Sequence, residues 1–412
     1  MAFAALIAAY QEAEEGEAGL RAMLPMAGRS LLEHQVRRAV AAGASHAVIL
    51  VERVPAALSA ALDRLKRDGI TVQLARDPMD AADYFHPEEN VLLVADGLVA
   101  APDCFEAMAA RLAPALLVVA DTPENDEFER VDADNRWAGL ALTTVDTVEA
   151  TAQMLGDWDL QSTLMRRIVQ TGADFLPVDG EAGVVIDASE AVLLAEGSER
   201  SRSAGRTMLR RNSLLADSWP ERFLYGPAAA RIAPMLLDRG VEALWLRIAA
   251  LVFALAAAAA FWWGWLWVGL GLALIAGPID AIAGRVDLAQ LRDHAGSWEI
   301  RLVKGVAQAL TILAVGGLGM TATGEIAYLA VALIGVLLLI LARRGIQELR
   351  KLIEAENRLL PWLADGNAAI WLILPFAVTG FWFHWPISVA IYAYITLFLQ
   401  QNMMKDAIRK RN

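Results

Sequence analysis

The fold is decided first by an apolar stretch near the C-terminus, residues 326–341, which reads Ile326-Ala-Tyr-Leu-Ala-Val-Ala-Leu-Ile-Gly-Val-Leu-Leu-Leu-Ile-Leu341. A second run of the same kind covers residues 248–263, and neither run contains an Asp, Glu, Lys or Arg. The whole chain has 412 residues, of which 57% are hydrophobic, and a mean hydropathy of +0.40. Runs this apolar are typical of helices that cross a bilayer. We therefore expect an integral membrane protein whose hydrophobic excess lies after residue 242.

Around these two runs the sequence predicts a six-helix transmembrane domain, with helices of roughly 20 residues each. The predicted spans are 243–262, 264–283, 303–322, 325–342, 367–383 and 386–402. The basic residues between and after the spans all fall on one side: Arg285, Arg292, Arg301, Lys304, Arg343, Arg344, Arg350, Lys351, Lys405, Arg409, Lys410 and Arg411. Because basic loops face the cytosol, we expect a multi-pass protein of a bacterial-type inner membrane with both termini cytosolic.

Before residue 197 the pattern becomes that of a water-soluble α/β domain. Short apolar runs alternate with amphipathic stretches, beginning at 3–9, 30–42 and 47–51. This alternation predicts a doubly wound, mostly parallel sheet with helices on both faces over residues 1–196, ending in a helix at 189–196. The formal net charge of -12 lies mainly in this half. An acidic domain argues against a nucleic-acid partner.

A basic connector separates the two predicted domains. Residues 197–211 contain five arginines and show no apolar periodicity, so we expect residues 197–216 to form an Arg-rich linker. Such a linker is either a solvated connector or a contact to an anionic membrane surface. Residues 217–242 then mix apolar side chains with Arg222 and Arg231. This composition predicts an amphipathic segment at the membrane interface.

One stretch of the α/β domain carries a family signature. It runs Arg21-Ala-Met-Leu-Pro-Met-Ala-Gly-Arg29-Ser-Leu-Leu-Glu-His34, and it resembles the K-x-L-L-P-V-x-G-R-P-L-L-E-H signature of sugar-phosphate and MobA-like nucleotidyltransferases. The resemblance implies nucleotide binding by Arg21 and Arg29. It also implies that Asp96, at a strand end, and Asp187 supply carboxylates for a metal-bound nucleotide, with Asp96 as the metal ligand.

The same stretch departs from the family in its phosphate-binding loop. Family members have a glycine-rich loop after the first strand, where bare backbone N–H groups approach the triphosphate. Here the corresponding residues 8–17 contain four glutamates, Glu12, Glu14, Glu15 and Glu17. Like charges at contact distance repel, at a cost on the order of 1 kcal/mol each near a surface. The charge pattern therefore favours a domain that is nucleotidyltransferase-like in fold.

The membrane half carries a second resemblance, at the end of the second predicted span. Gly277-Pro-Ile-Asp280-Ala-Ile-Ala-Gly-Arg285 resembles the D-x-x-D-G-x-x-A-R motif of CDP-alcohol phosphotransferases, with Gly277 in place of the first aspartate. That family has six helices and an amphipathic lead-in segment. The resemblance implies a catalytic site from Asp280, Arg285 and Glu299, with Asp280 as a metal ligand and Asp287 or Asp293 nearby.

The carboxylates needed for a two-metal site are incomplete in this half. The family continues with two further aspartates, whereas the corresponding stretch 294–304 contains Glu299 together with Arg301 and Lys304. Two divalent ions need about four carboxylates to offset their charge. A simpler reading is that Asp280 and Arg285 pair with each other and fasten the helix end. The arginines Arg222, Arg231, Arg292 and Arg301 are candidates to hold a lipid phosphate.

The order of the two domains resembles bifunctional inositol-1-phosphate cytidylyltransferases fused to phosphoinositol-lipid synthases. Two functional hypotheses follow. In one, the protein is a catalytically degenerate partner or regulatory subunit of phospholipid head-group synthesis, working with an active paralogue and without a cofactor. In the other, it is an active transferase that uses Mg²⁺ and a CDP-linked substrate. The resemblance implies membrane lipids as partners and a homodimer under either hypothesis.

Overall fold

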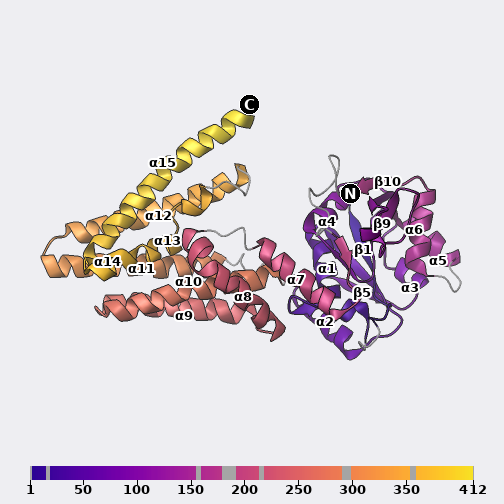
Figure 1. The fold of residues 1–412 in the computed structure, drawn as a ribbon, viewed down its shortest axis with the longest axis horizontal. Helices are drawn as coiled ribbons and strands as arrows, with labels where there is room; N and C mark the ends of the chain where they lie inside the picture. Colours follow the sequence, from indigo (N-terminus) through magenta and orange to yellow (C-terminus); the bar gives the residue numbers. More distant parts are fainter. Residues whose placement is uncertain are drawn as a thin grey trace. The chain divides into compact units, whose positions relative to one another are not determined.

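The computed structural model describes residues 2–14, 19–154, 159–178, 192–212, 218–289, 298–352 and 359–411 (Figure 1). The chain divides into two compact units, Met1–Arg206 and Thr207–Asn412. The first unit contains the sheet and the second contains the long helices. This division agrees with the change of composition in the sequence.

A seven-stranded sheet organises the first unit, in the order β10-β8-β9-β6-β1-β4-β5. Neighbouring strands are parallel except at β9, which runs antiparallel to both β6 and β8. The prediction of a mostly parallel sheet is therefore confirmed. The strands are β1 (Phe3–Ala8), β4 (Ala44–Leu50), β5 (Val72–Ala75), β6 (Asn90–Val94), β8 (Ala115–Ala120), β9 (Asn135–Thr144) and β10 (Asp174–Pro177).

The core lies on both faces of this sheet, because the central strand is apolar throughout. All six residues of β1 are buried, as parallel strands covered on both sides require. The helices of the unit are α1 (Leu31–Ala41), α2 (Ala56–Arg67), α3 (Pro78–Ala82), α4 (Pro102–Ala109), α5 (Val145–Met154) and α6 (Leu160–Gln170). Helix α1 begins with a capping box, in which Ser30 and Glu33 satisfy each other's backbone N–H groups.

The strand order places a topological switch point between β1 and β6. The chain moves from β1 to β4 and β5 on one side, and then returns to β6 on the other side of β1. In open α/β sheets the crevice at the carboxyl ends of such strands is where ligands bind. Tyr10 follows β1 and Asp96 follows β6 at this edge.

A short two-stranded sheet lies beside this edge. It pairs β7 (Leu98–Ala100) with β11 (Val192–Leu194) in antiparallel fashion. The helix expected at 189–196 is therefore wrong where the structure describes it. Helix α7 (Ser198–Asn212) follows instead and occupies most of the expected linker. This segment contains no proline and a single glycine, and arginine is a good helix former, so its composition is compatible with a helix.

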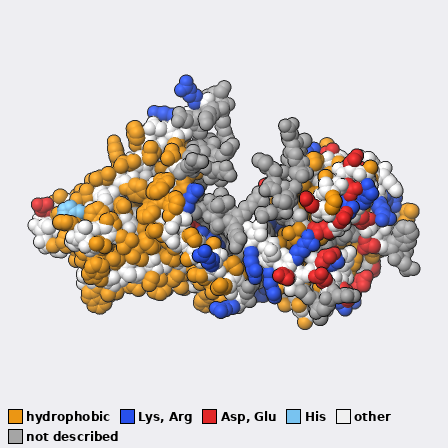
Figure 2. All heavy atoms as spheres, in the orientation of Figure 1, with side chains coloured by type: hydrophobic (Ala, Val, Ile, Leu, Met, Phe, Trp, Pro, Cys, Tyr) orange, Lys and Arg blue, Asp and Glu red, His pale blue; other side chains and the backbone are white. Residues whose placement is uncertain are grey.

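The second unit is a set of long apolar helices preceded by an amphipathic segment. Figure 2 shows hydrophobic side chains over most of the visible surface of this unit, whereas the α/β unit shows charges of both signs. The elements are the π-helical turn Glu221–Tyr225, α8 (Gly226–Asp238), α9 (Ala243–Trp262), α10 (Leu266–Ala289), α11 (Trp298–Thr323), α12 (Ala327–Leu352), α13 (Gly366–Trp371), α14 (Ile373–Thr379) and α15 (Trp385–Arg411).

Five helices, not six, are long and apolar enough to cross a membrane within the described residues. They are α9, α10, α11, α12 and α15. The predicted span at 367–383 consists of the short helices α13 and α14, which meet at Leu372. Pro375 explains the break. A proline has no N–H to donate to the carbonyl four residues earlier, which here belongs to Trp371, and the proline ring clashes with that carbonyl. Hydropathy averaged over a window does not detect such a break.

Helices α12 and α15 lie side by side and run in the same direction. Tyr328 contacts His384 near the start of both helices, while the Gln400 side chain donates a hydrogen bond of 2.8 Å to the Ala342 carbonyl farther along. Early residues of α12 thus contact the start of α15, and later residues of α12 contact later residues of α15, as in a parallel pair. Because α12 ends where α15 also ends, the segment between them has to return to the starting side. Helices α13 and α14 make this return.

This parallel arrangement predicts which sites share a side of the membrane. Single cysteines at Thr321 and Phe381, both exposed, should react with a membrane-impermeant maleimide from one side of sealed vesicles. Cysteines at Arg344 and Lys405 should react from the other side. The native Cys104 is buried, so the wild-type chain is the unlabelled control. Labelling of Thr321→Cys and Phe381→Cys from opposite sides would contradict the return through α13 and α14.

Candidate functional site

Asp96 lies at the switch point of the sheet and links the ends of β1 and β6. Its Oδ2 accepts hydrogen bonds from the backbone N–H groups of Tyr10, at 2.9 Å, and Gln11, at 2.8 Å. Its own N–H donates to the Gln161 side chain at 2.9 Å, at the start of α6. The sequence-predicted strand-end position of Asp96 is therefore observed. The carboxylate is therefore held by the two N–H groups that follow β1, and the backbone of Asp96 is held by α6.

The ionised form of Asp96 is poorly solvated at this position. The residue is 2% exposed, and its Oδ1 has no hydrogen-bond partner in the part of the chain that the structure describes. Burial raises the pKa of the Asp96 carboxyl to about 7, and the N–H groups of Gln11 and Tyr10 offset only part of this effect. A buried carboxyl with a strongly shifted pKa at a sheet switch point is a functional-site candidate.

Arg21 lies beside Asp96, so the structure brings these two predicted residues together. A Cβ atom placed on Gly97 would lie 3.5 Å from Arg21 Cδ. The guanidinium donates to the Gln11 side chain at 3.0 Å and to the Glu12 carbonyl at 3.2 Å. Its Nη2 forms an ion pair of 3.0 Å with Glu196. The anion that Arg21 meets is therefore a side chain of the protein itself.

Arg29, the other predicted nucleotide-binding arginine, is engaged in an ion pair that stabilises the fold. Its guanidinium lies 2.9 Å from Glu33, which also accepts from Arg64 at 2.8 Å. Burial alone would raise the pKa of Glu33, but Arg64, Ser30 and Arg29 together hold it at about 2. The side chains of Arg29 and Glu33 thus fasten the start of α1 to α2. Asp187 lies outside the described residues.

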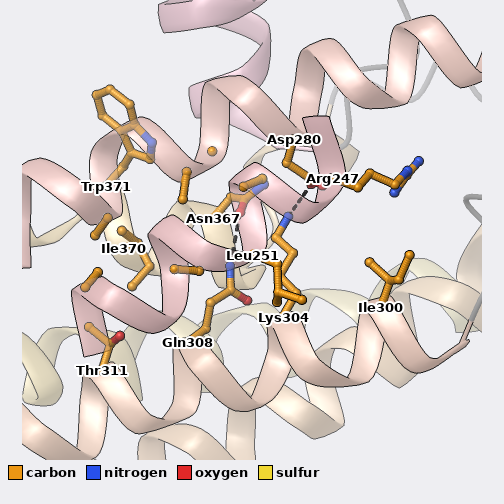
Figure 3. Close-up of a pocket in the computed structure, with 16 residues that line it drawn as sticks. Arg247, Leu251, Asp280, Ile300, Lys304, Gln308, Thr311, Asn367, Ile370 and Trp371 are labelled. Carbon is orange, nitrogen blue, oxygen red and sulfur yellow. Dashed lines mark hydrogen bonds and ion pairs between the residues drawn. The ribbon is translucent and has the colours of Figure 1, made fainter. Parts of the chain in front are cut away.

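The helical unit contains a pocket of about 560 Å³, a volume that includes space open to solvent. Its walls come from α9, α10, α11 and α13, and small side chains such as Ala254 and Ala273 form much of the surface. Figure 3 shows the polar side chains that face this space. They are Arg247, Asp280, Lys304, Gln308, Thr311, Asn367 and Trp371.

Asp280 and Lys304 form the central ion pair of the pocket. The Lys304 Nζ lies 2.5 Å from Asp280 Oδ2, and Figure 3 shows the two side chains pointing toward each other. One turn farther along α11, Gln308 donates to Asn367 at 3.1 Å. Arg247 at the pocket wall pairs with the buried Asp287 at 2.6 Å. Both cations that line the pocket therefore have carboxylate partners.

The remaining predicted residues lie away from the pocket lining. Arg285 is buried and pairs with Glu221 at 3.3 Å, so it fastens α10 to the amphipathic segment and does not pair with Asp280. Glu299 is exposed in the first turn of α11. Arg222 and Arg231 are exposed beside the apolar residues of the amphipathic segment. Arg292 and Asp293, and the Arg301 side chain, lie outside what the structure describes.

The donor set of the pocket does not fit a divalent metal. Mg²⁺ binds through several oxygen ligands, and a two-metal site needs several carboxylates. Asp280 is the one acidic side chain among the described residues that line the pocket, and it holds Lys304. Among all described residues, no group of three His, Cys, Asp or Glu side chains is arranged to hold a metal ion.

Two polar pocket residues of α11, Gln308 and Thr311, were not identified from the sequence, although a signal was present. They follow Lys304 at spacings of four and three, which places all three on one face of α11. Polar residues inside a span usually face a bundle interior or a cavity. Asn367 and Trp371 were hidden because they lie on the short helix α13, which was predicted as part of a continuous span.

The raised pKa of Asp96 predicts that the α/β unit becomes less stable to unfolding as the pH rises. The folded state binds the proton up to about pH 7, whereas an unfolded Asp titrates near 4. Stability contributed by this group therefore falls as the pH rises from about 4 to 7. Asp96→Asn cannot ionise, so the variant should be more stable than wild type at pH 8, on the order of 2 kcal/mol, with little difference at pH 4.

Pulse proteolysis in urea at pH 4, 6 and 8 measures this stability in the full chain. The matched control is Asp146→Asn, which changes an exposed carboxylate in the first turn of α5. Equal pH dependence of Asp96→Asn and wild type would show that folding does not shift the pKa of Asp96.

Comparison with known proteins gives no family assignment. No protein-family model matches the chain, and no curated protein matches it either.

Proposed function

We propose that this chain is a membrane protein of phospholipid head-group synthesis that acts as a catalytically inactive partner or regulatory subunit. The observation that carries the proposal is the Lys304 ammonium, 2.5 Å from the Asp280 carboxylate inside the pocket. Asp280 is the residue that the resemblance to CDP-alcohol phosphotransferases marks as a metal ligand. A side-chain cation takes the place next to Asp280 that a metal ion would need.

The charge of the pocket supports this proposal. An ammonium carries one positive charge and neutralises one carboxylate, so the Asp280–Lys304 pair has no net charge left to attract Mg²⁺. Removing one partner of a partly buried ion pair leaves the other uncompensated, typically at a cost of about 3–5 kcal/mol when burial is complete. A divalent ion would have to displace Lys304 against part of that cost, and Gly277 offers no second carboxylate.

The α/β unit supports the proposal independently. Arg21, which the nucleotidyltransferase resemblance implies as a phosphate ligand, is paired with Glu196. Glu12, the first of the four glutamates in the loop after β1, is paired with Arg53 at 2.6 Å. In both units, a charged side chain that the resemblance implies as a ligand is therefore paired with an opposite charge of the chain itself.

The amphipathic segment supports a setting at a lipid surface. Phe223, Ile232 and Met235 are exposed on the same segment as Arg222 and Arg231. Exposed apolar side chains together with arginines are typical of a helix that lies in the headgroup region of an anionic membrane. We propose that this surface faces the cytosolic leaflet, with both termini on that side.

The test compares catalysis and metal binding in the same preparation. Purified protein in lipid nanodiscs receives Mg²⁺ or Mn²⁺ with CDP-diacylglycerol and an alcohol, or with CDP-inositol, and CMP release is measured. Wild type should release no more CMP than Asp280→Asn. Wild type should also show no saturable Mn²⁺ binding by calorimetry, because Lys304 neutralises Asp280.

A variant that is expected to gain metal binding adds a positive result to this test. Gly277→Asp combined with Lys304→Ala places two carboxylates one helical turn apart and removes the competing ammonium. A Cβ at Gly277 has room, since its nearest neighbour is the Tyr225 hydroxyl at 3.4 Å. The double variant should bind Mn²⁺ saturably, and Lys304→Ala alone more weakly. CMP release by wild type that disappears in Asp280→Asn would instead establish an active transferase.

A further inference from the structure

A strap of six residues, 192–197, crosses the carboxyl edge of the sheet next to Asp96. Its first half is β11, in which Leu194 pairs with Leu98. Its second half continues over the turn after β6, where the Ala195 N–H donates to the Gly97 carbonyl at 2.8 Å. Gly97 has a φ of +78° and its missing Cβ would lie 3.0 Å from the Ala195 carbonyl oxygen. The strap therefore packs directly on the Asp96–Gly97 turn.

Glu196 is fixed in this strap with its carboxylate on Arg21. Its backbone carbonyl accepts a hydrogen bond of 2.9 Å from the Glu14 N–H, which ties the strap to the loop after β1. The Arg21 guanidinium uses its other nitrogens on Gln11 and on the Glu12 carbonyl. Those two contacts orient the guanidinium and leave its Nη2 to donate to an anion. That anion is the Glu196 carboxylate.

Exposure shows that this contact can be exchanged. The Glu196 side chain is 45% exposed and that of Arg21 is 21% exposed, so the carboxylate forms the solvent end of the pair. Ion pairs open to water contribute little to stability. A phosphate group offers more acceptor oxygens and more charge than a carboxylate, so its charge-assisted hydrogen bond to the Nη2 of Arg21 can replace that of Glu196. A phosphate-bearing ligand can therefore compete for Arg21, whereas the surrounding carboxylates oppose it while the strap is in place.

We propose that the strap is an autoinhibitory contact, in which Glu196 occupies the position on Arg21 that a phosphate-bearing anion takes when the strap is displaced. Displacement moves Glu196 away and also frees the Glu14 amide that is bonded to it. The inference goes beyond the proposed function, since it concerns regulated binding in the α/β unit.

The experiment removes the charge of Glu196 and keeps its size. Full-length wild type and Glu196→Gln are titrated in detergent with inorganic pyrophosphate and, separately, with CTP by calorimetry. Glu196→Gln should bind pyrophosphate at least tenfold more tightly than wild type. Adding Arg21→Gln to Glu196→Gln should abolish this gain. The matched control is Glu199→Gln, which removes an exposed charge in the first turn of α7.

Hydrogen exchange at Ala195 supplies a second readout that does not depend on affinity. The Ala195 amide should exchange faster in Glu196→Gln with pyrophosphate than in wild type, because displacement breaks its hydrogen bond to Gly97. Similar affinity for pyrophosphate and CTP would support recognition of the phosphates alone, and tighter binding of CTP would support added contacts from the nucleoside.

Two results would overturn the autoinhibitory contact. One is an affinity for both ligands that is the same in Glu196→Gln and wild type, with Ala195 exchange unchanged. The other is an equal gain of pyrophosphate affinity in Glu199→Gln, which would show that the change in net charge alone causes the effect. Neither result affects CMP release or Mn²⁺ binding at the Asp280 pocket, so failure here is distinct from failure of the proposed function.

Discussion

An ionised side chain away from water needs a counter-charge within a few ångströms, and this chain supplies its own at the positions that matter most. Lys304 neutralises Asp280 and Arg247 neutralises Asp287 in the helical unit. In the α/β unit, Glu33 is compensated by Arg29, just before α1, and by Arg64 on α2. Because isolated charges in a low-dielectric interior are very costly, these pairs limit what else the sites can hold.

The sequence was sufficient for the architecture where its signals are local and repeated. The alternation of apolar and amphipathic segments predicted the parallel sheet, since β1, β4 and β6 are largely apolar and bounded by polar turns. The long apolar runs predicted the spans in the same way. The prediction of a sixth full-length span failed at 367–383, where the structure has the short helices α13 and α14, because a window average detects neither their short length nor the break at Leu372.

The candidate sites were less predictable, because they depend on which side chains meet. Asp96 could be placed at a strand end from its local sequence. That Lys304 would pair with Asp280 required α10 and α11 to line the same pocket, which no spacing along the chain encodes. Arg29 shows the opposite case: its motif is matched, but in the structure the same residues cap a helix and balance a buried carboxylate. Residues that match a binding motif can therefore serve only to stabilise the fold.

The shared direction of α12 and α15 has an electrostatic consequence. Each helix carries a dipole equivalent to roughly half an elementary negative charge at its C-terminal end. An antiparallel pair would place opposite ends together and cancel their fields, whereas these two helices concentrate their negative ends at one place. The sequence puts arginines and lysines in the last turns of both helices, such as Arg350 and Arg409, where positive charge opposes this combined field. The basic character of that membrane face therefore also stabilises the helix ends themselves.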